Sequence, residues 1–299
     1  MNKPARALAA ETSIRRVEAV INPASGGVGP QSAAALKQIL DDFGLESRVL
    51  SPSAGEIEYA LQAAVQAVPD LLIVLAGDGT AGRAAELCGP DGPLLAPLPG
   101  GTMNMLPYAL YGPKPWPEVL ADCLWRGVER PVSCGEVGGH RFYCVAILGS
   151  PALWQPVREA TRHSDLAAAW DKALIALRQA FSTRLRFQVA GEAPQKAIAL
   201  SLICPLISRA LATENSLEAA GLHHRDLMEL FRLGFHNLLG DWRADPGVIT
   251  EPCIEGRVWA RRRIPCLIDG EMRWLARSAN IRFHPTAFRA LAPPPEIKP

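Results

Sequence analysis

The sequence has 299 residues, of which 48% are hydrophobic and 20% are charged, and its formal net charge is +1. This balance is typical of a globular protein that buries its own core, and the length favours two ordinary domains over one large domain. A nearly neutral chain gives no electrostatic reason to expect nucleic acid as a partner, so an anionic ligand would have to bind at a local site.

The sequence shows no pattern typical of export or of a membrane span. Residues 1–20 lack the continuous apolar core of a signal peptide, and the apolar stretch 197–207 is interrupted by Ser201 and Pro205 and is too short to cross a bilayer. The seven cysteines are odd in number and contain no CxxC pair, which is typical of reduced thiols. We therefore expect a cytoplasmic protein that has no metal site of its own.

Short apolar runs alternate with helix-like segments over the first 130 residues. The runs predict strands at 17–22, 46–50, 71–76 and 93–99, and the intervening segments predict helices at 31–43, 55–68 and near 82–88. Such alternation is typical of a mostly parallel sheet covered by helices on both faces. Residues 1–130 are therefore expected to form an α/β domain.

The pattern changes after Arg130. Strands are expected at 140–148, 183–191, 196–203, 254–262, 264–269 and 278–285, and helices at 164–181 and 225–242. The strand pattern predicts an antiparallel β-sandwich or barrel as a second domain over 131–285. Residues 286–299 form a proline-rich tail that could pack back on the first domain.

Three strands of the first domain end in loops rich in glycine and hydroxyl residues. These loops are INPASGG at 21–27, AGDGT at 76–80 and LPGGTMN at 98–104. In open α/β sheets, ligands bind outside the carboxyl ends of the strands, so the loops would present backbone N–H groups and hydroxyls to an anion. The GDG segment alone would more often be a plain turn with Asp78 or Thr80 as a helix N-cap, but three such loops together favour a phosphate site.

These three motifs, in this order and spacing, resemble those of the diacylglycerol kinase catalytic-domain family, which includes sphingosine kinases and bacterial lipid kinases. The segment IPCLIDGEMRW at 264–274 resembles the DGE segment of the family's second domain, so the similarity spans nearly the whole chain. The resemblance implies an α/β domain similar to that of NAD kinases and phosphofructokinases, followed by a β-sandwich. It also implies transfer of the γ-phosphoryl group of ATP, carried with Mg²⁺, to a lipid hydroxyl in the cleft between the domains.

Carried over residue by residue, the resemblance assigns both a nucleotide site and a catalytic site. The residues implied at the nucleotide are Asn22, Pro23, Ala24, Ser25, Gly26, Ser51, Ala76, Gly77, Asp78, Gly79, Thr80, Gly101, Thr102 and Asn104. Asp78 is expected near the magnesium ion or the ribose-phosphate region, and Asp269 or Glu271 is expected to be the general base. A hairpin would place these last two carboxylates on the same face of a strand.

The sequence departs from the family at several positions. Ala76 replaces the first glycine of GGDGT, and Arg83 lies in a segment where the family has Asn and Glu. Met105 and Ala220 stand where the family has two acids of the magnesium and water network, so the auxiliary metal site is expected to be lost. Three alternatives stay open: a lipid kinase, a kinase of a soluble or specialised hydroxyl acceptor, and a pseudokinase that binds nucleotide or lipid.

Three other features bear on partners. The expected helix at 225–242 carries an apolar stripe, which could contact the inner face of a membrane but is more often packed core. The RRR run at 261–263 is expected to be a solvated strand end, and the sequence gives only weak support for its binding anionic headgroups. Edge strands of the sandwich could also pair in a homodimer.

Overall fold

The computed structural model describes residues 14–149, 184–189, 191–208, 215–222 and 248–294. The chain divides into two compact units, one made of residues 1–133 with 286–299 and the other of residues 134–285. The helices expected at 164–181 and 225–242 lie outside the described residues.

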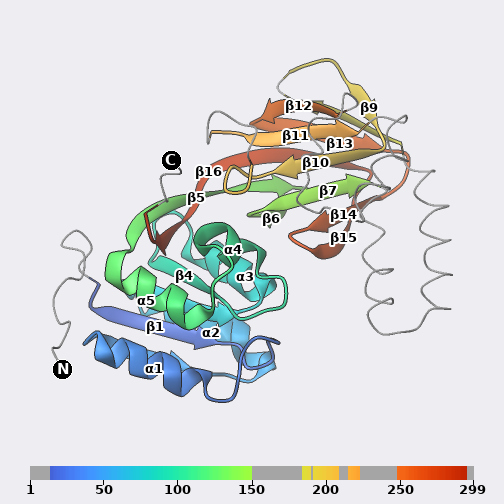
Figure 1. Ribbon diagram of the computed structural model, residues 1–299. Coiled ribbons are helices and arrows are strands. Elements are labelled where there is room, and N and C mark those ends of the chain that lie inside the picture. Colours follow the sequence, from blue (N-terminus) through green and yellow to red (C-terminus); the bar gives the residue numbers. More distant parts are fainter. Residues whose placement is uncertain (1–13, 150–183, 190, 209–214, 223–247, 295–299) are drawn as a thin grey trace. The chain divides into compact units, whose positions relative to one another are not determined.

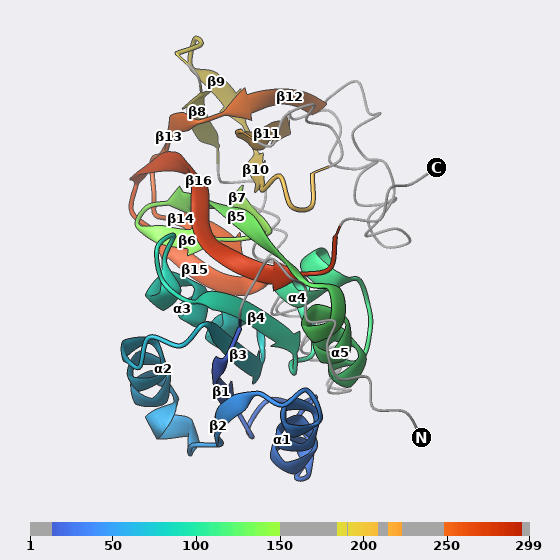
Figure 2. The same cartoon turned by 90° about the vertical axis from the view of Figure 1, so that its left-hand side faces the viewer.

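The first unit (Figure 1) is built on parallel strands in the order β2-β1-β3-β4, all four of which are labelled in Figure 2. Ala290 of the last strand pairs in parallel with Leu95 of β4. The bounds are β1 Arg16–Ile21, β2 Glu46–Leu50, β3 Leu71–Ala76 and β4 Leu94–Pro99. Every residue of β3 and β4 is buried, which explains their continuous apolar sequences, because both faces of a central parallel strand are covered.

Helices cover both faces of this sheet. Their bounds are α1 Ser32–Asp42, a 3₁₀ turn η1 Ala54–Glu56, α2 Ile57–Gln66, α3 Asp78–Cys88, α4 Met105–Tyr111 and α5 Trp116–Arg126. Figure 2 shows α1 and α5 on one face and α2 and α3 on the other. The mostly parallel α/β fold expected from the sequence is confirmed.

The helices differ from the expected ones at three places. Helix α3 begins at Asp78 and not near residue 82, and the helices α4 and α5 were not among the predicted elements. Two glycines lie in the first five residues of α3, and glycine disfavours helix, so the local composition hid the start of this helix.

The second unit consists of two antiparallel sheets. One has the order β16-β13-β8-β9, with β5 paired to β16 and β6 paired to β5, and the other has the order β12-β11-β10-β7-β14-β15. The bounds are β5 Val128–Val137, β6 His140–Phe142, β7 Val145–Gly149, β8 Leu185–Val189, β9 Gln195–Ala197, β10 Ala199–Ile203, β11 Leu217–Leu222, β12 Val248–Cys253, β13 Glu255–Ala260, β14 Ile264–Ile268, β15 Glu271–Leu275 and β16 Ser278–Ala292.

A single buried cluster joins these two sheets. Phe187 and Val258 come from one sheet, and Leu200 and Ile264 come from the other. Alternate residues of each strand enter this cluster, as expected when two sheets pack face to face. The second unit is therefore the expected β-sandwich.

All seven cysteines are buried thiols. Burial raises the pKa of Cys88, Cys123, Cys253 and Cys266 to about 12, so these four thiols stay protonated near neutral pH. Among the helices that the structure describes, none is long and apolar enough to cross a membrane.

Candidate functional site

The three glycine-rich loops meet at the carboxyl ends of β1, β3 and β4. The backbone N–H of Asn22 donates to the carbonyl of Leu75 at 3.0 Å, and the N–H of Gly100 donates to the carbonyl of Ala76 at 3.0 Å. The N–H of Gly27 donates to the carbonyl of Gly100 at 2.9 Å. Backbone hydrogen bonds therefore connect each loop to a neighbouring loop or strand end.

Side chains add further links between the first and second loops. Ser25 Oγ accepts a hydrogen bond from the N–H of Gly77 at 3.1 Å, and Asn22 Nδ2 donates to Thr80 Oγ1 at 3.3 Å. Asn22 Oδ1 also accepts from the N–H of Ala24 at 3.0 Å. These contacts show why an Asn and a Ser are needed at these positions: each fixes the course of a loop.

Asn104 organises the third loop from within. Its side chain is only 5% exposed, and its φ of +51° lies in the left-handed region, which Asn tolerates better than most residues. Oδ1 accepts from the N–H of Gly101 at 2.7 Å, while Nδ2 donates to the carbonyl of Gly101 at 2.9 Å and to Tyr108 Oη at 3.3 Å. One amide group thus closes the Gly101–Asn104 turn and ties it to α4.

Asp78 joins the second loop to the third. Its Oδ1 accepts from the N–H of Leu106 at 3.1 Å, at the start of α4. Burial raises the pKa of Asp78 above its ordinary value, and backbone N–H groups at Leu106, Met105 and Asn104 oppose this shift by stabilising the charged form. The carboxylate therefore serves as a cap for a helix that has no side-chain cap at its own N-cap residue, Asn104.

Close packing explains the glycines of these loops. A Cβ on Gly101 would lie 2.6 Å from the Cα of Gly77, and one on Gly100 would lie 2.7 Å from the backbone nitrogen of Ala76. A Cβ on Gly27 would lie 3.0 Å from the carbonyl oxygen of Gly100. The residue-by-residue assignment from the sequence left out Gly27, Gly100 and Tyr108, although the repeated glycines and the four-residue spacing from Asn104 to Tyr108 were signals that could have found them.

Other predicted residues line the same edge of the sheet. Those exposed at the loop surfaces are Pro23, Ala24, Gly26, Gly79 and Thr102. Ser51 is also exposed, directly after β2, and the pairing of Val20 with Leu50 places it beside the end of β1. Within the described chain, no hydrogen bond links Ser51 to the three loops, so it shares their edge of the sheet without fixing their shape.

The DGE segment lies in the second unit as the turn between β14 and β15. Asp269 and Gly270 have φ values of +42° and +88°, and Ile268 pairs with Glu271 across this tight hairpin. The expectation that Asp269 and Glu271 share one face of a strand is wrong, because Asp269 occupies the left-handed turn while Glu271 is the first residue of β15.

The two carboxylates have different surroundings. Asp269 accepts three backbone N–H bonds, from Tyr143 at 2.7 Å, Cys144 at 3.0 Å and Val145 at 2.8 Å. Glu271 is exposed, and its Oε2 pairs with the guanidinium of Arg273 at 2.5 Å. Asp269 thus holds the hairpin against β7, whereas the Glu271 carboxylate faces solvent.

The residues at the positions where the family has acids or Asn have the following places in the structure. Met105 is the first residue of α4, and Ala220 is buried in β11 opposite Ser201. Arg83 forms ion pairs with Glu58 of α2 at 2.7 Å and with Glu86 at 2.9 Å. Among the described residues, no group of three or more His, Cys, Asp or Glu side chains is arranged to hold a metal ion.

Residues 16–137 match the family model of the diacylglycerol kinase catalytic domain. This segment therefore carries a diacylglycerol kinase catalytic domain. The match spans all three glycine-rich loops, so the family assignment made from the sequence motifs is confirmed.

Proteins named as diacylglycerol kinases resemble most of the chain. A protein of Bacillus subtilis (strain 168) named diacylglycerol kinase is 26% identical over 276 residues, which cover 86% of this chain and 90% of the relative. The crystal structure of a diacylglycerol kinase from Bacillus anthracis str. Sterne superposes with a TM-score of 0.68 at 15% identity, covering 95% of this chain and 99% of that one. A second structure from the same strain gives a TM-score of 0.71 at 17% identity. The structural likeness supports the fold, and the family assignment supports a phosphotransferase function.

Proposed function

We propose that this protein is an ATP-dependent lipid kinase, which transfers the γ-phosphoryl group to a hydroxyl of a diacylglycerol-like or sphingoid-like lipid. The observation that carries the proposal is the hydrogen-bonded joining of three glycine-rich loops at the carboxyl edge of a parallel sheet, in a chain of a kinase family. Phosphoryl transfer depends mainly on holding the phosphates and stabilising their charge, and these loops are suited to both.

The start of α3 supplies the means of holding phosphate. The helix begins at Asp78 with no side-chain cap at Gly77, so the N–H groups of its first turn, at Gly79 and Thr80, are available to phosphate oxygens. The positive end of the helix dipole adds to this attraction. Gly26, Gly79 and Thr102 are exposed beside it and would let the triphosphate approach the backbone closely.

The remaining loop residues keep this phosphate site in shape. Asn22, Ser25 and Asn104 hold the loops through the hydrogen bonds described above, and Asp78 ties the second loop to α4. Mg²⁺ carried with the nucleotide would neutralise phosphate charge during transfer. The negative charge of Asp78 near the phosphate loops would favour that ion, whereas the buried Ala220 offers no ligand for an auxiliary metal.

We assign Glu271 as the general base that takes the proton from the acceptor hydroxyl. Its carboxylate is exposed, and an exposed ion pair such as that with Arg273 contributes little, so the side chain can turn toward a substrate. Asp269 is less suitable, because three backbone N–H groups already occupy both of its oxygens. Asp269 is therefore proposed as the residue that fixes the hairpin carrying Glu271.

Calorimetry with ATP and Mg²⁺ tests the nucleotide part of this proposal. Binding should be saturable and should be competed by ADP, because both nucleotides offer phosphates to the α3 amides. A purified, folded protein that takes up no nucleotide would refute the assignment of the three loops.

A second candidate is a nucleotide-binding or lipid-binding pseudokinase, favoured by Met105 and Ala220 in place of acids. Release of ADP with a lipid extract in mixed micelles would support the kinase, whereas heat protection by ATP without ADP release would support the pseudokinase. ADP release with a lipid-free extract, but not with the lipid extract, would indicate a soluble or specialised acceptor. For the lipid kinase, we place the reaction at the cytoplasmic face of a membrane, where such acceptors reside.

A further inference from the structure

The second unit contains a cavity of about 860 Å³ that is lined mainly by cationic side chains. The described residues that line it are Arg184, Leu185, Arg186, Lys196, Trp259, Ala260, Arg261 and Arg262. Five of these eight side chains are positively charged and none is negatively charged. The nearly neutral composition of the chain therefore conceals a local concentration of positive charge.

Strand register brings these distant residues together. Arg186 of β8 pairs with Lys196 of β9 on one side and with Trp259 of β13 on the other. Because neighbouring side chains on paired strands share a face, these three lie side by side, while the adjacent Phe187 enters the core. Arg261 and Arg262 follow in the turn after β13.

The described residues provide no counter-charge for these cations. Arg184, Arg186, Lys196, Arg261 and Arg262 are all exposed, and none of their side chains makes an ion pair or hydrogen bond within the described part of the chain. Five like charges around one cavity repel one another, and an anionic partner would relieve that repulsion.

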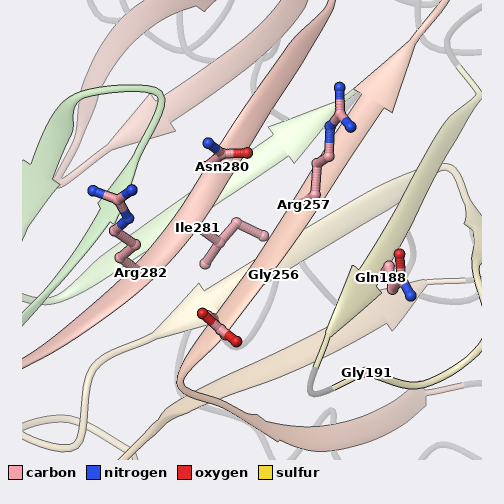
Figure 3. Close-up of a pocket in the computed structure, with 8 residues that line it drawn as sticks. Gln188, Gly191, Gly256, Arg257, Asn280, Ile281 and Arg282 are labelled. Atoms are coloured by element: carbon pink, nitrogen blue, oxygen red, sulfur yellow. The ribbon is translucent and has the colours of Figure 1, made fainter.

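The neighbouring part of the same sheet is different. Figure 3 shows Arg257 on β13 and Arg282 on β16, which line a smaller pocket of about 270 Å³ together with Glu255. Arg257 donates to Ser278 Oγ at 2.8 Å, and Glu255 pairs across the strands with Arg282. The smaller pocket therefore contains an acid, Glu255, beside its two arginines, whereas the described residues of the larger cavity include no acid.

We propose that this cationic cavity, with Trp259, is a docking surface for bilayers that contain anionic phospholipids. Arginine and lysine bind phosphate headgroups, and tryptophan is favoured at the boundary between headgroups and acyl chains. The cations are spread over β8, β9, the residue before β8 and the turn after β13. This spread matches a surface of many phosphates better than it matches a single small anion. The choice of a bilayer rests on the proposed lipid acceptor, but the binding itself requires no turnover.

Sedimentation with lipid vesicles tests the proposal. The full chain should pellet with vesicles that contain about 30% phosphatidylglycerol in phosphatidylcholine and should stay in solution with pure phosphatidylcholine. Removing two charges by the double substitution Arg261→Gln with Arg262→Gln should weaken partitioning roughly 20-fold to 30-fold, since each cation near an anionic surface contributes about a fivefold factor. Raising the salt to about 1 M should abolish binding of the unaltered chain.

A matched control removes the same net charge elsewhere. Lys37→Gln with Arg126→Gln changes two exposed cations that already pair with Asp41 and Asp122, and it should leave vesicle binding within about twofold. Circular dichroism and thermal unfolding would verify that both double variants are folded.

The proposal would be overturned by equal loss of binding in the two double variants, by equal binding to neutral vesicles, or by displacement of the protein by millimolar inorganic phosphate. Retention on RNA without vesicle binding would also overturn it. ATP binding and turnover in detergent micelles are measured separately, so a failure of docking is distinguishable from a failure of the kinase proposal.

Discussion

Asp269 and Glu271 stand two residues apart in the sequence, yet the fold gives their carboxylates different surroundings. Asp269 is surrounded by the N–H groups of residues 143–145, whereas Glu271 is open to solvent. The DGE motif identified both acids as candidates for the general base but could not separate them, because the partners of Asp269 lie more than a hundred residues away in the chain.

This difference predicts separate effects for two conservative substitutions. Asp269→Asn replaces one acceptor oxygen with an NH₂ group that faces backbone donors, so it should lower the free energy of unfolding by about 1–3 kcal/mol. Glu271→Gln should change that free energy by less than about 0.5 kcal/mol, because the site is exposed. Urea unfolding of both variants measures this, and equal destabilisation would contradict the assigned roles.

Asp78 gives a prediction that depends on pH. Burial raises its pKa above the ordinary value of 3.8, so the folded protein binds this proton more tightly than the unfolded chain does. The contribution of this group to stability is therefore most favourable at low pH and is lost as pH rises from near 3.8 through the raised pKa. The side chain in Asp78→Asn does not titrate, so this variant does not lose stability in this way. The free energy of unfolding of the variant, relative to that of the original protein, should therefore be higher at pH 7 than near pH 4.

A second substitution at the same position controls for the helix cap. The Oδ1 of asparagine can still accept from the N–H of Leu106, whereas Asp78→Ala removes the cap of α4 and should destabilise the protein by about 1 kcal/mol. Thermal unfolding at several pH values compares the two variants. A pH-independent difference between Asp78→Asn and the original protein would contradict the account of this carboxylate.

At the scale of elements, the predictable parts were those with strong local patterns. The continuous apolar sequences of β3 and β4 indicated buried parallel strands, and the loops that follow them were recognised by their glycines. The start of α3 was missed because of its two early glycines. The presence of α4 was missed because it depends on a cap from Asp78 and on a left-handed Asn104, which are tertiary features. In the sequence, Arg83 was noted only as a departure from the Asn and Glu of the family. In the structure it forms an ion pair that connects α3 to Glu58 of α2.

Loop packing predicts a strong effect of one added methyl group. In Gly101→Ala the new Cβ would lie 2.6 Å from the Cα of Gly77, so the second and third loops would have to separate. ATP affinity measured by calorimetry should fall at least about tenfold, since phosphate binding depends on the placement of these amides. Gly55→Ala is the control, because a Cβ there meets nothing within 4 Å and its affinity should be unchanged.

At the scale of the whole molecule, composition was a poor guide to charge distribution. The net charge of +1 argued against an extended anionic partner, but strand pairing gathers Arg186, Lys196 and the turn at 261–262 around one cavity. The order of strands that produces this cluster joins segments separated by more than sixty residues, so only the structure could show it. The two-part organisation was easier to foresee, since the change from regularly alternating helices and strands to a strand-rich pattern is visible in the sequence.

Transfer of labelled phosphate from [γ-³²P]ATP to lipid, by the original chain and by Glu271→Gln, tests the central claim most directly. We expect a labelled, organic-extractable product from the original chain and at least a tenfold lower rate from the variant, with ATP binding and stability unchanged. Equal rates for the two proteins would contradict the assignment of Glu271. No labelled lipid from a folded protein that binds ATP would contradict the proposal of a lipid kinase.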